Sequence, residues 1–117
     1  MTTSIVVLAG CALGAGLAGA HAVLQRSEPR ADSSHKRPPE EVRLYFSERL
    51  EPAYSTLRVL DARDGQVDER DARVDRANPT LLRATLPSLP AGRYRVRWRV
   101  ISIDADATEG EFTFKIE

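Results

Sequence analysis

Sulfur-containing residues are almost absent from this chain of 117 residues. The single cysteine, Cys11, and the single methionine, Met1, both lie within the first 20 residues. The remaining sequence therefore has neither a disulfide nor a thiol site. Soft metal ions prefer thiolate or thioether ligands, so the sequence excludes a sulfur-ligated metal site from residues 21–117.

Net charge is also absent, because 17 lysine and arginine residues balance 17 aspartate and glutamate residues. Net charge therefore favours neither nucleic acid nor an anionic membrane as a partner. The sequence also lacks a glycine-rich phosphate loop and a metalloprotease helix. Asp32, Ser33 and His35 have the residue types of a hydrolase triad, but neighbours in one proline-bounded loop cannot supply its convergent geometry. We therefore predict that the protein is not an enzyme.

Residues 5–20 form an apolar run that is rich in glycine and alanine. Its length and composition are typical of the core and cleavage site of a signal peptide, and it is too short for a comfortable membrane span. Ala18-Gly19-Ala20 has the small-x-small form of a signal-peptidase site. We therefore predict a signal peptide at residues 1–20 and one exported domain, periplasmic or secreted, at residues 21–117.

A second form of processing competes with this prediction. Residues 8–11 resemble a bacterial lipobox, in which Cys11 would be lipidated and become the first residue. The apolar run before Cys11 is short and uncharged for that purpose, so we favour cleavage after Ala20. The choice matters because cleavage after Ala20 gives His21 a free α-amine, whereas lipidation of Cys11 leaves His21 in mid-chain.

Alternation of apolar and polar residues predicts strands throughout the domain. The longest pattern, residues 93–102, places Tyr94, Val96, Trp98 and Val100 on one face and four arginines on the other. We also expect an irregular loop at residues 30–41, a hairpin turn at Asp64-Gly65 and an exposed edge strand or two short pieces at residues 67–76. Further strands are expected at residues 22–25, 41–47, 55–60, 81–86 and 110–117.

These strands predict an all-β fold, a Greek-key sandwich or barrel of the immunoglobulin-like or cupredoxin-like kind with about seven to eight strands. The four arginines then share one sheet face. That face is either a docking surface for an acidic partner or a solvated surface with weak salt bridges. We favour the solvated surface, because acidic residues are equally numerous.

Two segments contain groups that could bind a metal ion. At a processed N-terminus, His21 offers an amine and an imidazole nitrogen, which suit Cu(II). The loop at residues 102–110 adds the carboxylates of Asp104 and Asp106, which a turn could bring toward one ion. The alternatives are an accidental N-terminal histidine and an acidic loop that serves solubility.

Four sequence blocks together resemble the CopC-type copper-resistance proteins, which are small periplasmic copper binders with a β-sandwich fold. The blocks are HAVL with SEP in residues 21–29, VRLYFSE at 42–48, LPAGRYRVRWRVIS at 89–102 and GEFTFKI at 110–116. The resemblance implies one Cu(II) ion, held by the N-terminal histidine and by an aspartate and a histidine of an S-x-D-x-H-x-x-x-G loop. It also implies a possible inner-membrane copper transport protein as a partner.

The chain departs from this pattern at one ligand. His21, Asp104 and Gly110 match the family, but Asp106 stands where the family has the loop histidine. A carboxylate is a harder ligand than imidazole, so a site of His21, Asp104 and Asp106 should bind Cu(II) more weakly. His35 is the other histidine that could compensate, and nothing in the spacing places it there.

Three functions therefore remain as hypotheses. The first is an exported Cu(II)-binding protein for copper tolerance or delivery. The second is a CopC-like interaction module that has lost metal binding. The third is a copper oxygenase with an N-terminal histidine, which is disfavoured because a second copper histidine and a broad substrate face are missing.

Overall fold

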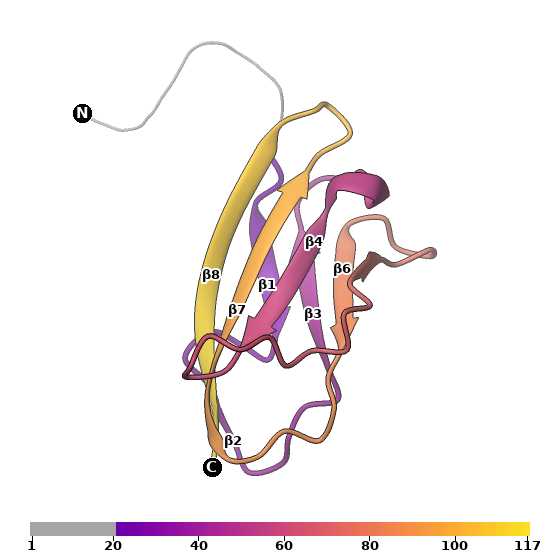
Figure 1. Cartoon of the computed structure of the whole chain (residues 1–117). Coiled ribbons are helices and arrows are strands. Elements are labelled where there is room, and N and C mark those ends of the chain that lie inside the picture. Colours follow the sequence, from indigo (N-terminus) through magenta and orange to yellow (C-terminus); the bar gives the residue numbers. More distant parts are fainter. Residues whose placement is uncertain (1–20) are drawn as a thin grey trace, which may run out of the picture.

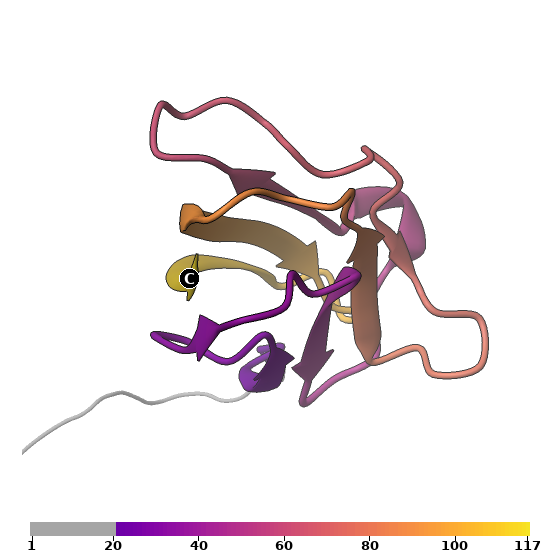
Figure 2. The ribbon, with the colours of Figure 1, turned by 90° about the horizontal axis from the view of Figure 1, so that it is seen from below.

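The computed structural model describes residues 21–117 as two sheets packed face to face (Figures 1 and 2). The expected signal peptide and the alternative lipidation site at Cys11 lie outside the described residues. One sheet has the strand order β1-β3-β6-β5 and the other has the order β2-β8-β7-β4. The fold is thus the predicted all-β sandwich.

The first sheet contains β1 (Leu24–Glu28), β3 (Glu41–Phe46), β6 (Leu81–Thr85) and β5 (Arg73–Val74). The second contains β2 (Ser34–His35), β8 (Ala107–Ile116), β7 (Gly92–Ile101) and β4 (Thr56–Leu60). All neighbouring strands are antiparallel except β2 and β8, which are parallel. A 3-10 turn, η1 (Pro52–Tyr54), precedes β4. Within residues 21–117, no helix is long and apolar enough to cross a membrane.

The core lies between the sheets and follows the predicted alternation. In β3 every second residue, Val42, Leu44 and Phe46, is buried. In β7 the buried residues are Tyr94, Val96 and Val100, and half-buried Trp98 packs against the core from the same face. The two sheets therefore share one apolar core. Its other buried members include Leu50, Leu57, Val59, Leu82, Ala84, Leu86, Leu89, Phe114 and Ile116.

Several predicted boundaries were shifted. The first strand begins at Leu24 and continues to Glu28, and the last begins at Ala107 rather than at Gly110. The hairpin expected at Asp64-Gly65 forms a turn, but its strand pairing is reduced to one bridge between Leu60 and Gln66. The Asp61 side chain stabilises this turn by accepting the amide hydrogens of Arg63 and Gly65, both at 2.9 Å.

The segment at residues 67–76 contains only the two-residue strand β5, which agrees with the expectation of short pieces. Its aspartates accept backbone amide hydrogens that a regular ladder would otherwise use. Asp68 accepts from Val59 at 2.9 Å, and Asp71 accepts from Thr85 at 2.8 Å.

One strand was missed by the sequence pattern. Residues 30–41 were expected to be irregular, yet Ser34 and His35 add to the C-terminal end of β8 as the parallel strand β2. Two residues are too few to show a period, which explains why the pattern carried no signal.

Candidate metal site

The first residues of the domain are fixed at the end of the sandwich where β8 begins, at the top of Figure 1. The Thr108 hydroxyl of β8 donates to the Ala22 carbonyl at 2.9 Å, and Ala22 is 2% exposed. On the other side, the Val23 amide donates to Ser47 Oγ at 2.9 Å, and the Ser47 hydroxyl donates to the His21 carbonyl at 3.3 Å. His21 is exposed, but its carbonyl is bound to Ser47 and the carbonyl of the next residue, Ala22, to Thr108 of the other sheet.

The loop between β7 and β8 forms a tight turn around a buried serine. Ser102 is fully buried; its amide donates to the Asp106 carbonyl at 2.9 Å, and its Oγ accepts the Asp106 amide at 3.3 Å. The Ala105 amide closes the turn on the Ser102 carbonyl at 2.8 Å, with Ala105 in the left-handed region at a φ of 70°. Asp104 is exposed at the tip and Asp106 is half-buried.

The three predicted ligands therefore come to the same end of the molecule. Asp106 lies two residues before Thr108, which holds the backbone next to His21. Within residues 21–117, however, no three histidine, cysteine, aspartate or glutamate groups lie close enough together to hold a metal ion. The imidazole and carboxylates fit Cu(II) in donor type, without forming an assembled three-ligand geometry in this conformation.

Thr108 and Ser47 are the positioning residues that sequence reasoning missed. Thr108 is separated from its partner Ala22 by 86 residues, and Ser47 from Val23 by 24. Nothing local in the sequence marks such long-range pairs. By contrast, Ser102 stands in the S-x-D pattern, and its buried hydroxyl now gives that position a structural reason.

His35 lies at the opposite end of the sandwich, paired with Ile116 near the C-terminus (Figure 1). The 10 residues of β8 separate the two ends, which corresponds to a distance of roughly 30 Å. His35 is therefore not available to the loop that contains Asp106, and it does not compensate for the missing histidine.

The structure also places Ser33 beside His35. Ser33 Oγ lies 2.7 Å from His35 Nε2, and the Ser33 hydroxyl donates to the Arg30 carbonyl at 2.6 Å. A serine hydroxyl has one hydrogen, so which atom donates in the Ser33–His35 contact depends on the tautomer of the imidazole. The Ser33 hydroxyl therefore lies within hydrogen-bond distance of both the His35 ring and the Arg30 carbonyl.

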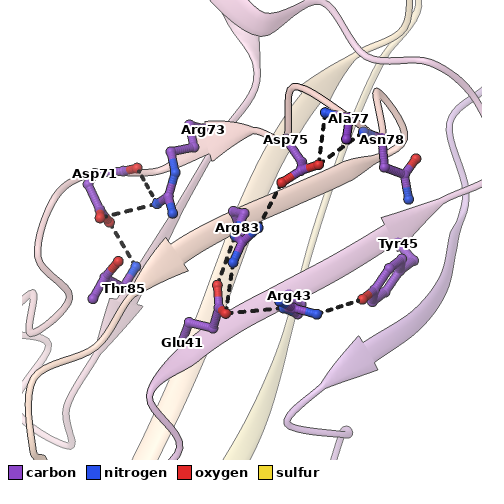
Figure 3. Close-up of polar contacts among 10 residues, drawn as sticks. All are labelled: Glu41, Arg43, Tyr45, Asp71, Arg73, Asp75, Ala77, Asn78, Arg83 and Thr85. Carbon is purple, nitrogen blue, oxygen red and sulfur yellow. Dashed lines mark hydrogen bonds and ion pairs between the residues drawn. The ribbon is translucent and has the colours of Figure 1, made fainter.

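A separate charged network covers the outer face of the first sheet (Figure 3). The Arg83 guanidinium donates two bonds to Glu41, both at 2.9 Å, and a third to Asp75 at 2.7 Å. Partial burial opposes ionisation of Glu41, but bonds and charge from Arg83, supported by Arg43, outweigh it and lower the Glu41 pKa. The bond from Arg83 likewise lowers the pKa of Asp75. The carboxylates of Glu41 and Asp75 thus have their cationic partners within the network, which links β3 to β6.

Comparisons with known proteins agree with this architecture. A family model described as "CopC domain" matches residues 24–117. Copper resistance protein C of Pseudomonas syringae pv. tomato is 30% identical over 122 residues, covering 99% of this chain and 96% of the relative. Copper transport protein CutJ of Bacillus subtilis is 28% identical over 98 residues, which are 83% of this chain but 18% of CutJ.

A solved structure gives the same result. The crystal structure of CopC from Methylosinus trichosporium OB3b matches with a TM-score of 0.78 and 32% identity, covering 83% of this chain and 94% of that chain. The chain therefore belongs to the CopC domain family.

Proposed function

We propose that the protein is an exported copper-homeostasis protein that binds Cu(II) at the β7–β8 end of the sandwich. The observation that carries this proposal is the bond from the Thr108 hydroxyl to the Ala22 carbonyl, because it fixes the backbone beside His21 next to the acidic loop. The name of the Pseudomonas syringae relative supports copper as the metal.

The proposed ligands are the amine and imidazole nitrogens of His21 and the carboxylates of Asp104 and Asp106. The amine becomes available only when the chain is cleaved after Ala20, so export and metal binding are linked in this proposal. Cu(II) accepts nitrogen and oxygen ligands in a tetragonal arrangement. Since the chain has no assembled three-ligand cluster in residues 21–117, binding would require the exposed Asp104 and the half-buried Asp106 carboxylates to turn toward His21.

We also propose a membrane-bound copper transport protein as the partner of this domain. The support is the match to CutJ, in which a segment similar to this chain makes up 18% of a longer protein named for copper transport.

A second candidate function is an interaction module without metal. Asp106 in place of the family histidine favours it, because a carboxylate supports Cu(II) binding less well than imidazole. Three exposed apolar side chains could then serve contacts with a partner: Val23 at 57%, Tyr54 at 64% and Ile103 at 51% exposure.

The test is a Cu(II) titration of protein that begins at His21, followed by calorimetry and electron paramagnetic resonance. We expect one Cu(II) per chain, lost in His21→Ala and on acetylation of the amine, and retained in His35→Ala as the matched control. Asp106→His should tighten binding by at least about tenfold, which corresponds to about 1.4 kcal/mol.

Two results would decide against copper binding at the proposed site. An absence of uptake by the correctly processed protein would favour the interaction module. Uptake that survives His21→Ala but is lost in His35→Ala would place the metal at the other end of the sandwich. The intact mass of the exported protein establishes independently whether cleavage exposes His21.

A further inference from the structure

An open groove of about 440 Å³ crosses the outer face of β4, β7 and β8, away from the core. Each of the three strands contributes polar or charged side chains to it. The contributing residues are Thr56 and Arg58 from β4, Arg97 and Arg99 from β7, and Glu109 and Glu111 from β8.

The positive charges of this groove are only partly neutralised from within. Arg58 and Arg97 stand directly opposite each other on neighbouring strands, a like-charge pairing that disfavours the sheet. Arg97 donates to Glu111 at 3.0 Å. Arg58 and Arg99 are exposed and take part in none of the ion pairs found within residues 21–117.

We propose that this arginine groove binds a short acidic segment of a partner protein through carboxylates placed on Arg58 and Arg99. A guanidinium presents a planar fork of donors that matches a carboxylate. Arg97 already binds a carboxylate at the groove wall through one bond, from its Nε to Glu111 Oε1. A bound carboxylate would also offset the repulsion between Arg58 and Arg97.

The shape and composition of the face favour an acidic peptide over an anionic membrane. The site is a concave groove, which a short peptide can enter and a broad bilayer surface cannot. Surface-binding elements also bury apolar side chains in the lipid interface. Among residues 21–117, the large exposed apolar side chains are Val23, Tyr54 and Ile103, which lie outside β4, β7 and β8.

The experiment measures fluorescence anisotropy of a short fluorescein-labelled oligo-glutamate peptide on titration with the protein. We expect saturable binding that weakens as salt is added, because the contacts are exposed to screening. The double variant Arg58→Glu with Arg99→Glu should weaken binding by at least about tenfold. The control is Arg37→Glu with Arg76→Glu, which makes the same change in net charge at two exposed arginines elsewhere on the surface.

A third variant tests whether Glu111 competes with the peptide for Arg97. Glu111→Gln should tighten binding, since it releases Arg97 from its own carboxylate without reversing a charge. Far-ultraviolet circular dichroism and thermal unfolding of each variant confirm that the fold is retained.

Three outcomes would overturn the proposal. They are no saturable binding of oligo-glutamate, an equal loss in both double variants, and binding to anionic phosphatidylglycerol vesicles without binding to the peptide. The last outcome would assign the groove to a membrane surface. None of these measurements requires copper, so the result is independent of the proposed metal site.

Discussion

Trp98 and Gly110 stand opposite each other in the β7–β8 ladder, and the indole ring covers the glycine. A Cβ atom added at Gly110 would lie 2.7 Å from Trp98 Cη2, closer than carbon atoms pack. Trp98 is itself confined by Phe46 and Phe112, with ring centroids 6.2 and 6.1 Å away. Packing against Trp98 therefore explains why the sequence motif ends in a glycine, and no role in metal binding is needed to explain it.

Replacing Gly110 by alanine should lower the free energy of unfolding by about 1–3 kcal/mol, because the indole has little room to move. Urea denaturation measures this change. The control is Gly65→Ala, where the nearest atoms of Asp61 lie at an ordinary 3.4 Å and the change should be small. Equal effects of the two substitutions would contradict the proposed confinement of Trp98.

Arg83 is the second residue whose replacement should change the stability measurably, since it binds two carboxylates whose pKa values are lowered. Its side chain is 22% exposed, against 26% for Glu41 and 20% for Asp75. A carboxylate with a lowered pKa in the folded state stabilises the fold above its unfolded pKa. That stabilisation is lost as pH falls through the folded value.

Arg83→Met should therefore lower the melting temperature at neutral pH, and the difference from the original protein should shrink below the ordinary glutamate value of 4.5. Thermal unfolding between neutral and acidic pH measures both effects. Arg73→Met, at an ion pair whose side chains are 46% and 41% exposed, is the control and should change little. A gap that stays constant with pH would show that Arg83 acts by packing alone.

At the scale of elements, the edge of β4 is completed by a side chain instead of a strand. Asp68 is 6% exposed, and its carboxylate accepts the amides of Val59 at 2.9 Å and Arg70 at 3.1 Å. The Val67 amide in turn donates to the Val59 carbonyl at 2.8 Å. The segment after β4 thus satisfies the strand without joining it as a regular neighbour.

Asp68→Ala should leave the buried Val59 amide without an acceptor, at a cost of about 1–3 kcal/mol in the free energy of unfolding. Amide hydrogen exchange at Val59 should accelerate in the same variant. Glu69→Ala, which removes an exposed carboxylate from the next position, is the matched control. Unchanged protection of Val59 would mean that another group accepts its hydrogen.

The same segment shows how far the sequence could predict the elements. Alternation over five or more residues predicted β3, β4, β6 and β7 with small errors in their ends, because one face of each strand is buried. It could not predict that Asp68 and Asp71 replace strand pairing, since that depends on contacts made after folding. The two-residue strands β2 and β5 are likewise defined by their partners, not by their own pattern.

The candidate site was predictable only in part for a related reason. The sequence indicated His21, Asp104 and Asp106 as ligand types, and the turn around Ser102 had a motif. Their arrival at one end of the sandwich depends on Thr108 and Ser47, which meet their partners across long stretches of chain.

At the scale of the whole molecule, one core joins the two sheets, so they should unfold together. Leu82 of β6 and Leu57 of β4 are 0% and 1% exposed and belong to the same cluster, although they lie in different sheets. Truncating either leucine to alanine should lower the free energy of unfolding by about 2–5 kcal/mol in a single transition.

The check is to follow urea unfolding of Leu82→Ala and Leu57→Ala by far-ultraviolet circular dichroism and by Trp98 fluorescence. Trp98 is the one tryptophan of the chain and contacts Phe46 of the opposite sheet, so it reports on sheet packing. Coincident transitions are expected for both variants. Separate transitions in either variant would show that one sheet survives the loss of the other.

The short and interrupted outer strands have a consequence for how the protein meets other molecules. β2 and β5 each have two residues, β1 shifts register between Leu24 and Arg26, and Asp68 occupies an amide of β4. Long unpaired strands at the border of a sheet are templates for aggregation and for strand exchange between copies. Within residues 21–117 the sandwich offers little backbone of this kind, so pairing of its border strands with another chain is disfavoured.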